Sequence, residues 1–320
     1  MGFYAGIDLG GTNIAVGIVN DEFEIVAKAS VKTNAPRPEG EIADDMARAT
    51  KMACEKAGIK VSDLNWVGVG TPGAADRYSG IVLRADNLGF NHTPLRNLLS
   101  ERLEGKPVYI ENDANAATYG EVVAGAAKGV KDVIMITLGT GVGGGIIVDG
   151  DIYTGNNCFG AELGHMVIEY NGVRCTCGRK GCFESYCSAT ALIRMTKEEM
   201  LNSKDSKMWE LAGGSIDNVG GRTSFDAMRL GDEAGKRVVD KYISYLAAGI
   251  TNLINIFQPA VFIIGGGVCN EKNYLLDPLN EIVFKEEYSQ VKEGRCKIVT
   301  AELGNDAGII GAAFLGKATK

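Results

Sequence analysis

Residues 5–20 read AGIDLGGTNIAVGIVN, and residues 134–150 read IMITLGTGVGGGIIVDG. Each stretch has an apolar strand pattern, a glycine-rich turn and a second apolar strand pattern. The two stretches align with Asp8 opposite Thr137. Self-similarity of this kind indicates an internally duplicated chain with one glycine turn in each half.

The segments around these copies alternate between helical and strand patterns, which indicates α/β layering with parallel strands. Between the copies we expect helices at about 39–57, 95–104 and 113–125 and strands at 65–70 and 107–111. After residue 189 we expect a largely helical segment to about 256, a strand at 260–267 and an apolar helix at 306–318.

The length of 320 residues favours two domains, each able to bury a core. We expect a hinge near Asp113, because no proline- or serine-rich linker separates the halves. The predicted division is a smaller α/β domain, residues 1–113 with the last helix (305–320) packed back on it, and a larger α/β domain, residues 114–304.

Charge and hydropathy argue against several classes of partner. A net charge of -7 argues against nucleic acid or an anionic membrane as the main partner. Residues 242–270 carry no charge, but Asn252, Asn255 and Pro259 interrupt them, so we expect no membrane span. The N-terminus enters a strand pattern at once, without the features of a signal peptide, so we expect a cytoplasmic protein.

The two glycine turns are candidates for phosphate binding. GTGVGG satisfies the GxGxxG pattern, but dinucleotide binding requires a helix after the glycines and here a strand follows. The HRD and DFG elements of protein kinases are absent. The simpler interpretation is that both turns are ordinary tight hairpins. However, two glycine turns that face each other can bind a polyphosphate through their backbone N–H groups. The candidates are Gly10, Gly11, Thr12 and Asn13 in the first turn and Gly139, Thr140 and Gly141 in the second.

Two further features suit a magnesium-bound adenine nucleotide. Asp8 ends the first strand beside the first turn, where a carboxylate can hold Mg²⁺ directly or through water. The cluster Gly265, Gly266 and Gly267 follows an apolar strand and permits a flat ring to approach the backbone.

The loop CTCGRKGC contains three cysteines, Cys175, Cys177 and Cys182, and His165 precedes it. Three thiolates and one imidazole match the tetrahedral ligand set of a closed, structural zinc site. The sequence therefore predicts structural Zn²⁺ at these four residues. The other cysteines are scattered singly, and we expect them to be buried small side chains.

The strand PVYIE is followed by Asn112, Asp113 and an alanine-rich helix. An acid at a helix start is commonly only an N-cap. The helix dipole also favours its ionised form, which can accept the proton of a sugar hydroxyl. In phosphoryl transfer the protein mainly aligns the reactants while an aspartate takes the proton late. Asp113 is therefore the candidate catalytic base.

A polyhydroxylated substrate needs both donors and acceptors, and the side chains that offer them beside Asp113 are Asn87, Asn112, Glu162, His165 and Glu184. Glu162 and His165 share a face if their segment is helical. The simpler roles are metal binding for His165 and a first-turn helix acid at Glu184. An imidazole that gives one nitrogen to zinc keeps the other for a hydrogen bond.

The chain resembles the ROK family of bacterial sugar kinases nearly end to end, and most of all the ATP-dependent glucokinases within it. The segments that carry the resemblance are DLGGTNI, ENDANAATYGE, LGTGVGGGIIVDG, GAELGH, CxCGxxGC followed by Glu184, and LGNDAGIIGAA. It implies the actin/hexokinase-like (ribonuclease H-like) fold, in which two α/β domains close over sugar and ATP at an interdomain cleft. It also implies a homodimer that acts in glycolysis.

The resemblance implies a role for each candidate residue. The two turns would bind the phosphates of MgATP, Gly265–Gly267 the adenosine, and Asp113 would deprotonate the 6-hydroxyl of glucose. The sugar contacts and the zinc ligands would be the residues already named. Three positions depart from the glucokinase pattern: Ala161 stands where glycine is frequent, Phe90 where tryptophan is common, and Phe183 where a smaller aliphatic is usual.

Two other activities remain open. A fructokinase or an N-acetylmannosamine kinase of the same family would use the same base and zinc. A transcriptional regulator of the family would need a winged helix-turn-helix ahead of the first strand, and only seven residues precede Asp8. We therefore expect a kinase.

Overall fold

The computed structural model of the protein describes residues 2–318. The chain forms two compact units. The first contains the chain up to Ile134, Gly145–Ala161 and the chain from Glu302 onward, and the second contains Met135–Gly144 and Glu162–Ala301. Over the described residues, no helix has both the length and the apolar content that a bilayer crossing requires.

The first unit is built on a five-stranded sheet of strand order β3-β2-β1-β4-β8. Its strands are β1 (Phe3–Leu9), β2 (Asn13–Asn20), β3 (Ile25–Lys32), β4 (Leu64–Thr71) and β8 (Val108–Asn112). β2 pairs antiparallel with β1 and β3, whereas β4 is parallel to both β1 and β8. The carboxyl ends of β1, β4 and β8 therefore meet at one edge of the sheet.

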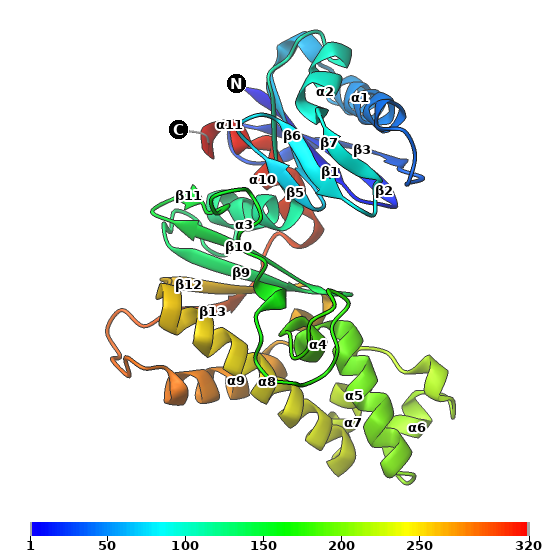
Figure 1. The fold of residues 1–320 in the computed structure, drawn as a ribbon, viewed down its shortest axis with the longest axis vertical. Coiled ribbons are helices and arrows are strands. Elements are labelled where there is room, and N and C mark those ends of the chain that lie inside the picture. Colours follow the sequence, from blue (N-terminus) through cyan, green and yellow to red (C-terminus); the bar gives the residue numbers. More distant parts are fainter. Residues whose placement is uncertain (1, 319–320) are drawn as a thin grey trace. The chain divides into compact units, whose positions relative to one another are not determined.

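Helices cover both faces of this sheet (Figure 1). The helices of the unit are α1 (Glu39–Lys56), α2 (Leu95–Arg102), α3 (Asp113–Ala124), α10 (Ala307–Ala313) and α11 (Leu315–Ala318). Ile7 of β1 belongs to the buried cluster that contains Ile42 and Met46 of α1. Because successive strand residues point to opposite faces, Gly6 faces the other side, where α10 packs on β1 and β4 and α3 packs on α10.

The predicted helix at 306–318 is interrupted. A short 3₁₀ turn (Gly304–Asp306) precedes α10, and Phe314 leaves helical geometry between α10 and α11. The Phe314 ring is fully buried against Tyr4 and Phe23. The predicted helix is therefore present as two segments that meet at a buried aromatic residue.

A three-stranded antiparallel sheet in the first unit is not predicted by the sequence patterns. It consists of β5 (Ala74–Asp76), β6 (Ile81–Ala85) and β7 (Phe90–Thr93). Phe90 is buried in the hydrophobic core of the unit. The turn between β6 and β7 carries Asn87.

A second five-stranded sheet has the order β11-β10-β9-β12-β13. Its strands are β9 (Val133–Leu138), β10 (Val142–Val148), β11 (Asp151–Ile152), β12 (Val261–Gly265) and β13 (Lys297–Thr300). In the first sheet, the duplicated strands β1 and β2 have one further strand beside β2 and two beside β1. In the second sheet, β9 and β10 likewise have one further strand beside β10 and two beside β9. The internal duplication predicted from the sequence is thereby confirmed.

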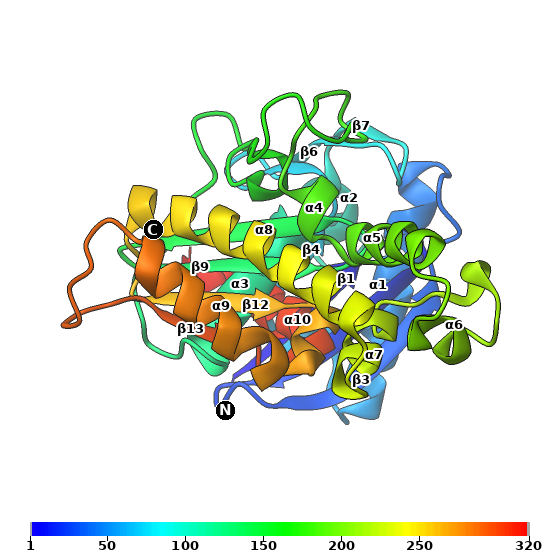
Figure 2. The same ribbon diagram turned by 90° about the horizontal axis from the view of Figure 1, so that it is seen from below.

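The predicted helical segment at 189–256 contains several helices. The helices of the second unit are α4 (Glu184–Cys187), α5 (Ala189–Asn202), α6 (Lys207–Leu211), α7 (Thr223–Arg229), α8 (Glu233–Phe257) and α9 (Asn273–Glu286). Figure 2 shows α8 and α9 side by side over the second sheet. α3, which begins at the predicted hinge residue Asp113, is part of the first unit. The division into domains at Asp113 stays a prediction.

Candidate functional site

The first glycine turn, residues 10–13, joins β1 to β2. The Gly10 N–H donates to the carbonyl of Asn13 at 2.9 Å, and the Thr33 hydroxyl donates to the Gly10 carbonyl at 2.6 Å. Lys32 Nζ donates to Asn13 Oδ1 at 2.9 Å. Thr12 and Asn13 are exposed, while Gly11 is half-buried. The turn is thus closed on the sheet side and open on the other, as a phosphate-binding turn must be.

Asp8 and Asp113 lie at the same edge of the first sheet. Asp8 is in register with Gly70, and Gly70 with Glu111 on the next strand. A β-carbon at Gly70 would lie 3.5 Å from Asp113 Cα, so the start of α3 rests directly on this glycine. Asp8 is half-buried, and burial raises its pKa. Gly70 is thus the neighbour that Asp8 and Asp113 share.

Asn112, and not Asp113, is the N-cap of α3. Its Oδ1 accepts hydrogen bonds from the N–H groups of Ala114 and Asn115, and its Nδ2 donates to the carbonyl of Gly73 at 3.0 Å. Asp113 is the first helical residue and its Oδ1 accepts from the Ala114 N–H at 2.8 Å. The simpler role of helix N-cap therefore belongs to Asn112 and not to Asp113. Much of the hydrogen-bonding capacity of Asn112 is taken by the protein, and its role as a sugar contact stays a prediction.

Glu111 is a buried acid that the sequence analysis did not single out. Its Oε1 accepts hydrogen bonds from the Asn112 N–H at 2.9 Å and Asn115 Nδ2 at 3.1 Å, and its Oε2 lies 3.7 Å from Arg77 Nε. Arg77 directs its terminal nitrogens to the carbonyls of Ile152 and Ala318 instead. Burial raises the pKa of Glu111 despite these partners. The sequence feature that could have identified Glu111 was its position just before the predicted helix that begins at Asp113.

Asn87 lies beside the first glycine turn. A β-carbon at Gly11 would be 3.5 Å from Asn87 Nδ2. The structure therefore brings together, in the first unit, the first turn, Asp8, Asn87, Asn112 and Asp113.

The second glycine turn, residues 139–141, is held from α5. The Gly139 N–H donates to the Gly141 carbonyl at 3.0 Å within the turn. The Ala189 N–H donates to the Gly139 carbonyl, and the Thr190 hydroxyl donates to the Thr140 carbonyl, each at 2.9 Å. Sequence patterns gave no signal for Thr190, because this contact depends on the tertiary fold.

The predicted adenosine loop lies against the strand that leads into this turn. Gly266 has φ 88°, and a β-carbon there would be 2.3 Å from the Leu138 carbonyl oxygen. Gly267 begins a 3₁₀ helix that ends at Glu271. The predicted strand at 260–267 therefore ends at Gly265, and the loop bends away where the backbone requires glycine.

The four predicted zinc ligands form one cluster. One ligand atom from each of His165, Cys175, Cys177 and Cys182 lies within 4.8 Å of the others. His165 Nδ1 is 3.7 Å from Cys175 Sγ, and the sulfurs of Cys177 and Cys182 are 3.7 Å apart. Such separations, together with three sulfurs and one nitrogen, fit a tetrahedral Zn²⁺ with bonds of about 2.0–2.3 Å. The residues present therefore fit the ion, which would brace the loop Cys175–Cys182, the zinc loop.

The acids beside the zinc loop take different positions. Glu162 is exposed and precedes a 3₁₀ turn (Leu163–His165), so it is one turn from His165, as the spacing predicted. Glu184 is in the first turn of α4 and is half-buried. Its Oε2 accepts a hydrogen bond from the Val142 N–H at 3.0 Å, directly after the second glycine turn. The second unit thus brings together its turn, the zinc loop and Glu184.

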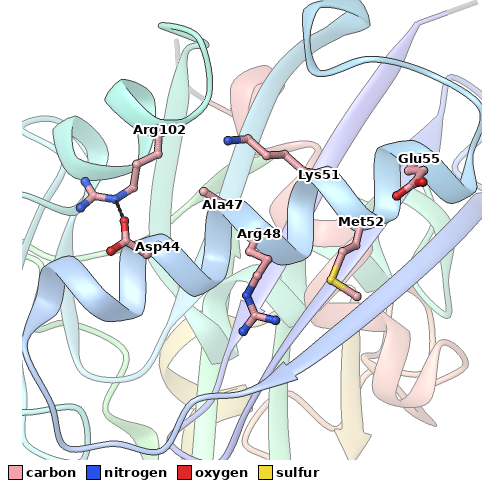
Figure 3. Close-up of a pocket in the computed structure, with 7 residues that line it drawn as sticks. All are labelled: Asp44, Ala47, Arg48, Lys51, Met52, Glu55 and Arg102. Atoms are coloured by element: carbon pink, nitrogen blue, oxygen red, sulfur yellow. Dashed lines mark hydrogen bonds and ion pairs between the residues drawn. The ribbon is translucent and has the colours of Figure 1, made fainter.

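A groove elsewhere in the first unit contains none of the predicted residues. It follows α1 and is lined by Asp44, Ala47, Arg48, Lys51, Met52, Glu55 and Arg102 (Figure 3). Arg102 Nε donates to Asp44 at 2.5 Å, and Arg48 pairs with Asp45. Charged side chains that pair in this way are typical of a helix face in contact with solvent, and we interpret the groove along α1 as such a face.

Comparison with known proteins shows which family the chain belongs to. The ROK family model matches residues 4–319. The glucokinase of Thermotoga maritima is 37% identical over 97% of this chain and 96% of its own length. A ROK family glucokinase from Streptomyces griseus, solved with glucose and AMPPNP, superimposes with a TM-score of 0.79 at 37% identity, over 98% of this chain and 99% of that one. The xylose repressor of Bacillus subtilis is 31% identical over 98% of this chain and 77% of its own length.

Two units, each with a mixed five-stranded sheet of the same strand order and a glycine turn, define a protein of the actin/hexokinase-like class. Within that class the chain belongs to the ROK family.

We expect one zinc ion per chain, measured by elemental analysis. Removing it with a chelator should lower the melting temperature by about 5 °C or more, because structural zinc contributes folding free energy. Cys177→Ser should abolish stoichiometric zinc, whereas Cys158→Ser, outside the cluster, should retain it. Equal zinc contents in the two variants would contradict this ligand set.

We expect Glu111→Gln to change how stability depends on pH. The raised folded-state pKa means that protonated Glu111 stabilises the fold below the unfolded-state pKa, and that this contribution is lost as pH rises through the folded-state pKa. The free energy of unfolding of the variant should therefore gain on that of the parent as pH rises above about 4, the unfolded-state pKa of a glutamate, measured by urea denaturation. Exposed Glu101→Gln serves as the control, and parallel curves for all three proteins would refute the assignment.

Proposed function

We propose that the protein is an ATP-dependent hexose kinase and, more specifically, a glucokinase. It transfers the γ-phosphate of MgATP to the 6-hydroxyl of glucose. The observation that carries the proposal is the pair of glycine turns at equivalent places in two sheets of the same strand order, each with a polar side chain beside it. Relatives named as glucokinases, one solved with glucose and AMPPNP, support the choice of hexose and nucleotide.

Asp113 acts as the general base. It accepts the proton of the 6-hydroxyl as the oxygen forms its bond to the γ-phosphorus and the bond from that phosphorus to the ADP oxygen breaks. The transition state of phosphoryl transfer is loose, so orientation and charge stabilisation matter more than the strength of the base. The position of Asp113 at the start of α3, resting on Gly70, supports this role because the helix N-terminus favours an anion.

Backbone N–H groups of the two turns hold the phosphates. Within Gly10–Asn13 and Gly139–Gly141, N–H groups other than those of Gly10 and Gly139, which close the turns, donate to phosphate oxygens. Gly265–Gly267 faces the adenosine. Asp8 is the residue that would hold Mg²⁺, which neutralises the charge that develops on the phosphates. Its raised pKa means that a proton competes with the metal at acidic pH.

Sugar recognition comes from Asn87, Asn112, Asp113, Glu162, His165 and Glu184. Zinc is structural in this proposal, and His165 both binds the metal and lies next to the substrate. By the same resemblance we propose a cytoplasmic homodimer that acts in glycolysis without nucleic acid as a partner. The similarity to a xylose repressor keeps a sugar-responsive regulator as the second candidate.

Asp113→Asn should lower kcat by about 10²–10⁴-fold, because the amide cannot take the proton. Glucose binding, measured by calorimetry, should remain detectable. Asp205→Asn, an exposed acid outside the candidate site, is the control for general effects of the substitution. Substantial turnover by Asp113→Asn would remove Asp113 from the role of base.

A coupled assay over a panel of hexoses tests the proposed substrate. With ATP, kcat/KM for glucose should exceed that for fructose and for N-acetylmannosamine by about tenfold or more, since unpaired polar groups penalise the wrong sugar. Polyphosphate in place of ATP tests the donor. A higher kcat/KM for another hexose would assign a different kinase activity, and no transfer to any hexose would favour the regulator.

A further inference from the structure

The carboxylate of Glu184 occupies the space that a side chain at Gly141 would need. A β-carbon at Gly141 would lie 2.4 Å from Glu184 Oε2, whereas a β-carbon at Gly139 would meet nothing within 4 Å. The same Oε2 accepts the Val142 N–H at 3.0 Å. One end of the second glycine turn is therefore built around this carboxylate oxygen.

The other carboxylate oxygen faces the zinc loop. Glu184 Oε1 accepts a hydrogen bond from the Thr176 hydroxyl at 3.4 Å and lies 3.7 Å from Cys175 Sγ. A single half-buried carboxylate thus contacts the glycine turn with one oxygen and the zinc loop with the other.

The backbone around Glu184 is fixed by contacts with the rest of the second unit. The Phe183 N–H donates to the Met166 carbonyl at 2.7 Å, and the Phe183 ring packs where a β-carbon at Gly249 would lie 2.3 Å away. The Tyr242 hydroxyl donates to the Cys187 carbonyl at 2.7 Å at the other end of α4. Because α4 is anchored at both ends, a change at Glu184 is taken up by its side chain and the two loops that it contacts.

We propose that Glu184 is a positioning residue that couples the zinc loop and the bound sugar to the second glycine turn. The coupling rests on the proposed function only for the identity of the ligands. A sugar hydroxyl that binds the carboxylate, or a metal that orders the zinc loop beside it, also fixes the Val142 N–H and the turn. In the opposite direction, a nucleotide that orders the turn fixes the carboxylate. Coupling between binding sites is reciprocal, so each ligand raises the affinity for the other.

Gly141→Ala is the variant that tests this coupling. The new methyl group displaces only the end of a flexible side chain, so we expect the variant to fold. Gly221→Ala is the control in the same unit and outside the candidate site, because its methyl group also meets nothing within 4 Å. We expect Gly141→Ala to weaken glucose binding about tenfold without nucleotide present, the size expected for a lost hydrogen bond to a charged group, and the control to change it less than about twofold.

A second readout does not depend on any sugar. Zinc release to a chromogenic chelator should be several-fold faster in Gly141→Ala than in Gly221→Ala. In a Glu184→Ala background the two glycine variants should no longer differ, which isolates the pairwise interaction.

The two readouts separate the coupling from the proposed function. Equal glucose affinities and equal zinc release rates for the two glycine variants would overturn the coupling. A difference in zinc release that disappears with Glu184→Ala supports it, even if the parent protein binds no glucose and the proposed substrate is therefore wrong.

Discussion

The packing of α10 on β1, β4 and α3 is the contact on which the predicted catalytic edge of the first unit depends. No side chains separate the backbones: a β-carbon at Gly6 would lie 1.9 Å from the Ile309 carbonyl oxygen, and one at Gly68 1.7 Å from that of Ala312. Gly311 makes the same kind of approach to α3. Backbones held this closely leave little freedom, so the start of α3 is placed rigidly over the ends of the strands.

The second unit uses glycine in the same way, at its loops. Gly266 lies against the Leu138 carbonyl and Gly164 against that of Val142, each at a distance no β-carbon could adopt. The adenosine loop and the segment that carries His165 are therefore both pressed onto the strands that flank the second glycine turn. In each unit, glycine therefore lets a loop or a helix approach the backbone of the strands that carry the turn.

The features that could be predicted from the sequence are those that local sequence patterns determine. Duplicated strands and turns gave the two sheets, and cysteines with a nearby histidine gave the metal cluster, because ligand type and spacing need no knowledge of distant contacts. The short strands β5–β7 were missed because their apolar positions are too few to show a period. The cap at Asn112 is local, but the pattern did not distinguish Asn112 from Asp113 as the residue that caps the helix. Ala161 has φ 63°, a conformation that favours glycine, which gives a physical reason for the glycine that is frequent at this position.

Glu111 and Asp113 show how two acids, two positions apart, acquire different chemistry. Glu111 points into the core, where burial raises its pKa and two N–H donors share one oxygen. Asp113 follows the cap residue and lies half-buried at the edge of the sheet. Arg77 donates its terminal nitrogens to backbone carbonyls, and its Nε lies 3.7 Å from Glu111 Oε2. Of the two acids, the half-buried Asp113 keeps the larger accessible surface, so it suits the role of the proposed base better than a carboxylate enclosed in the core.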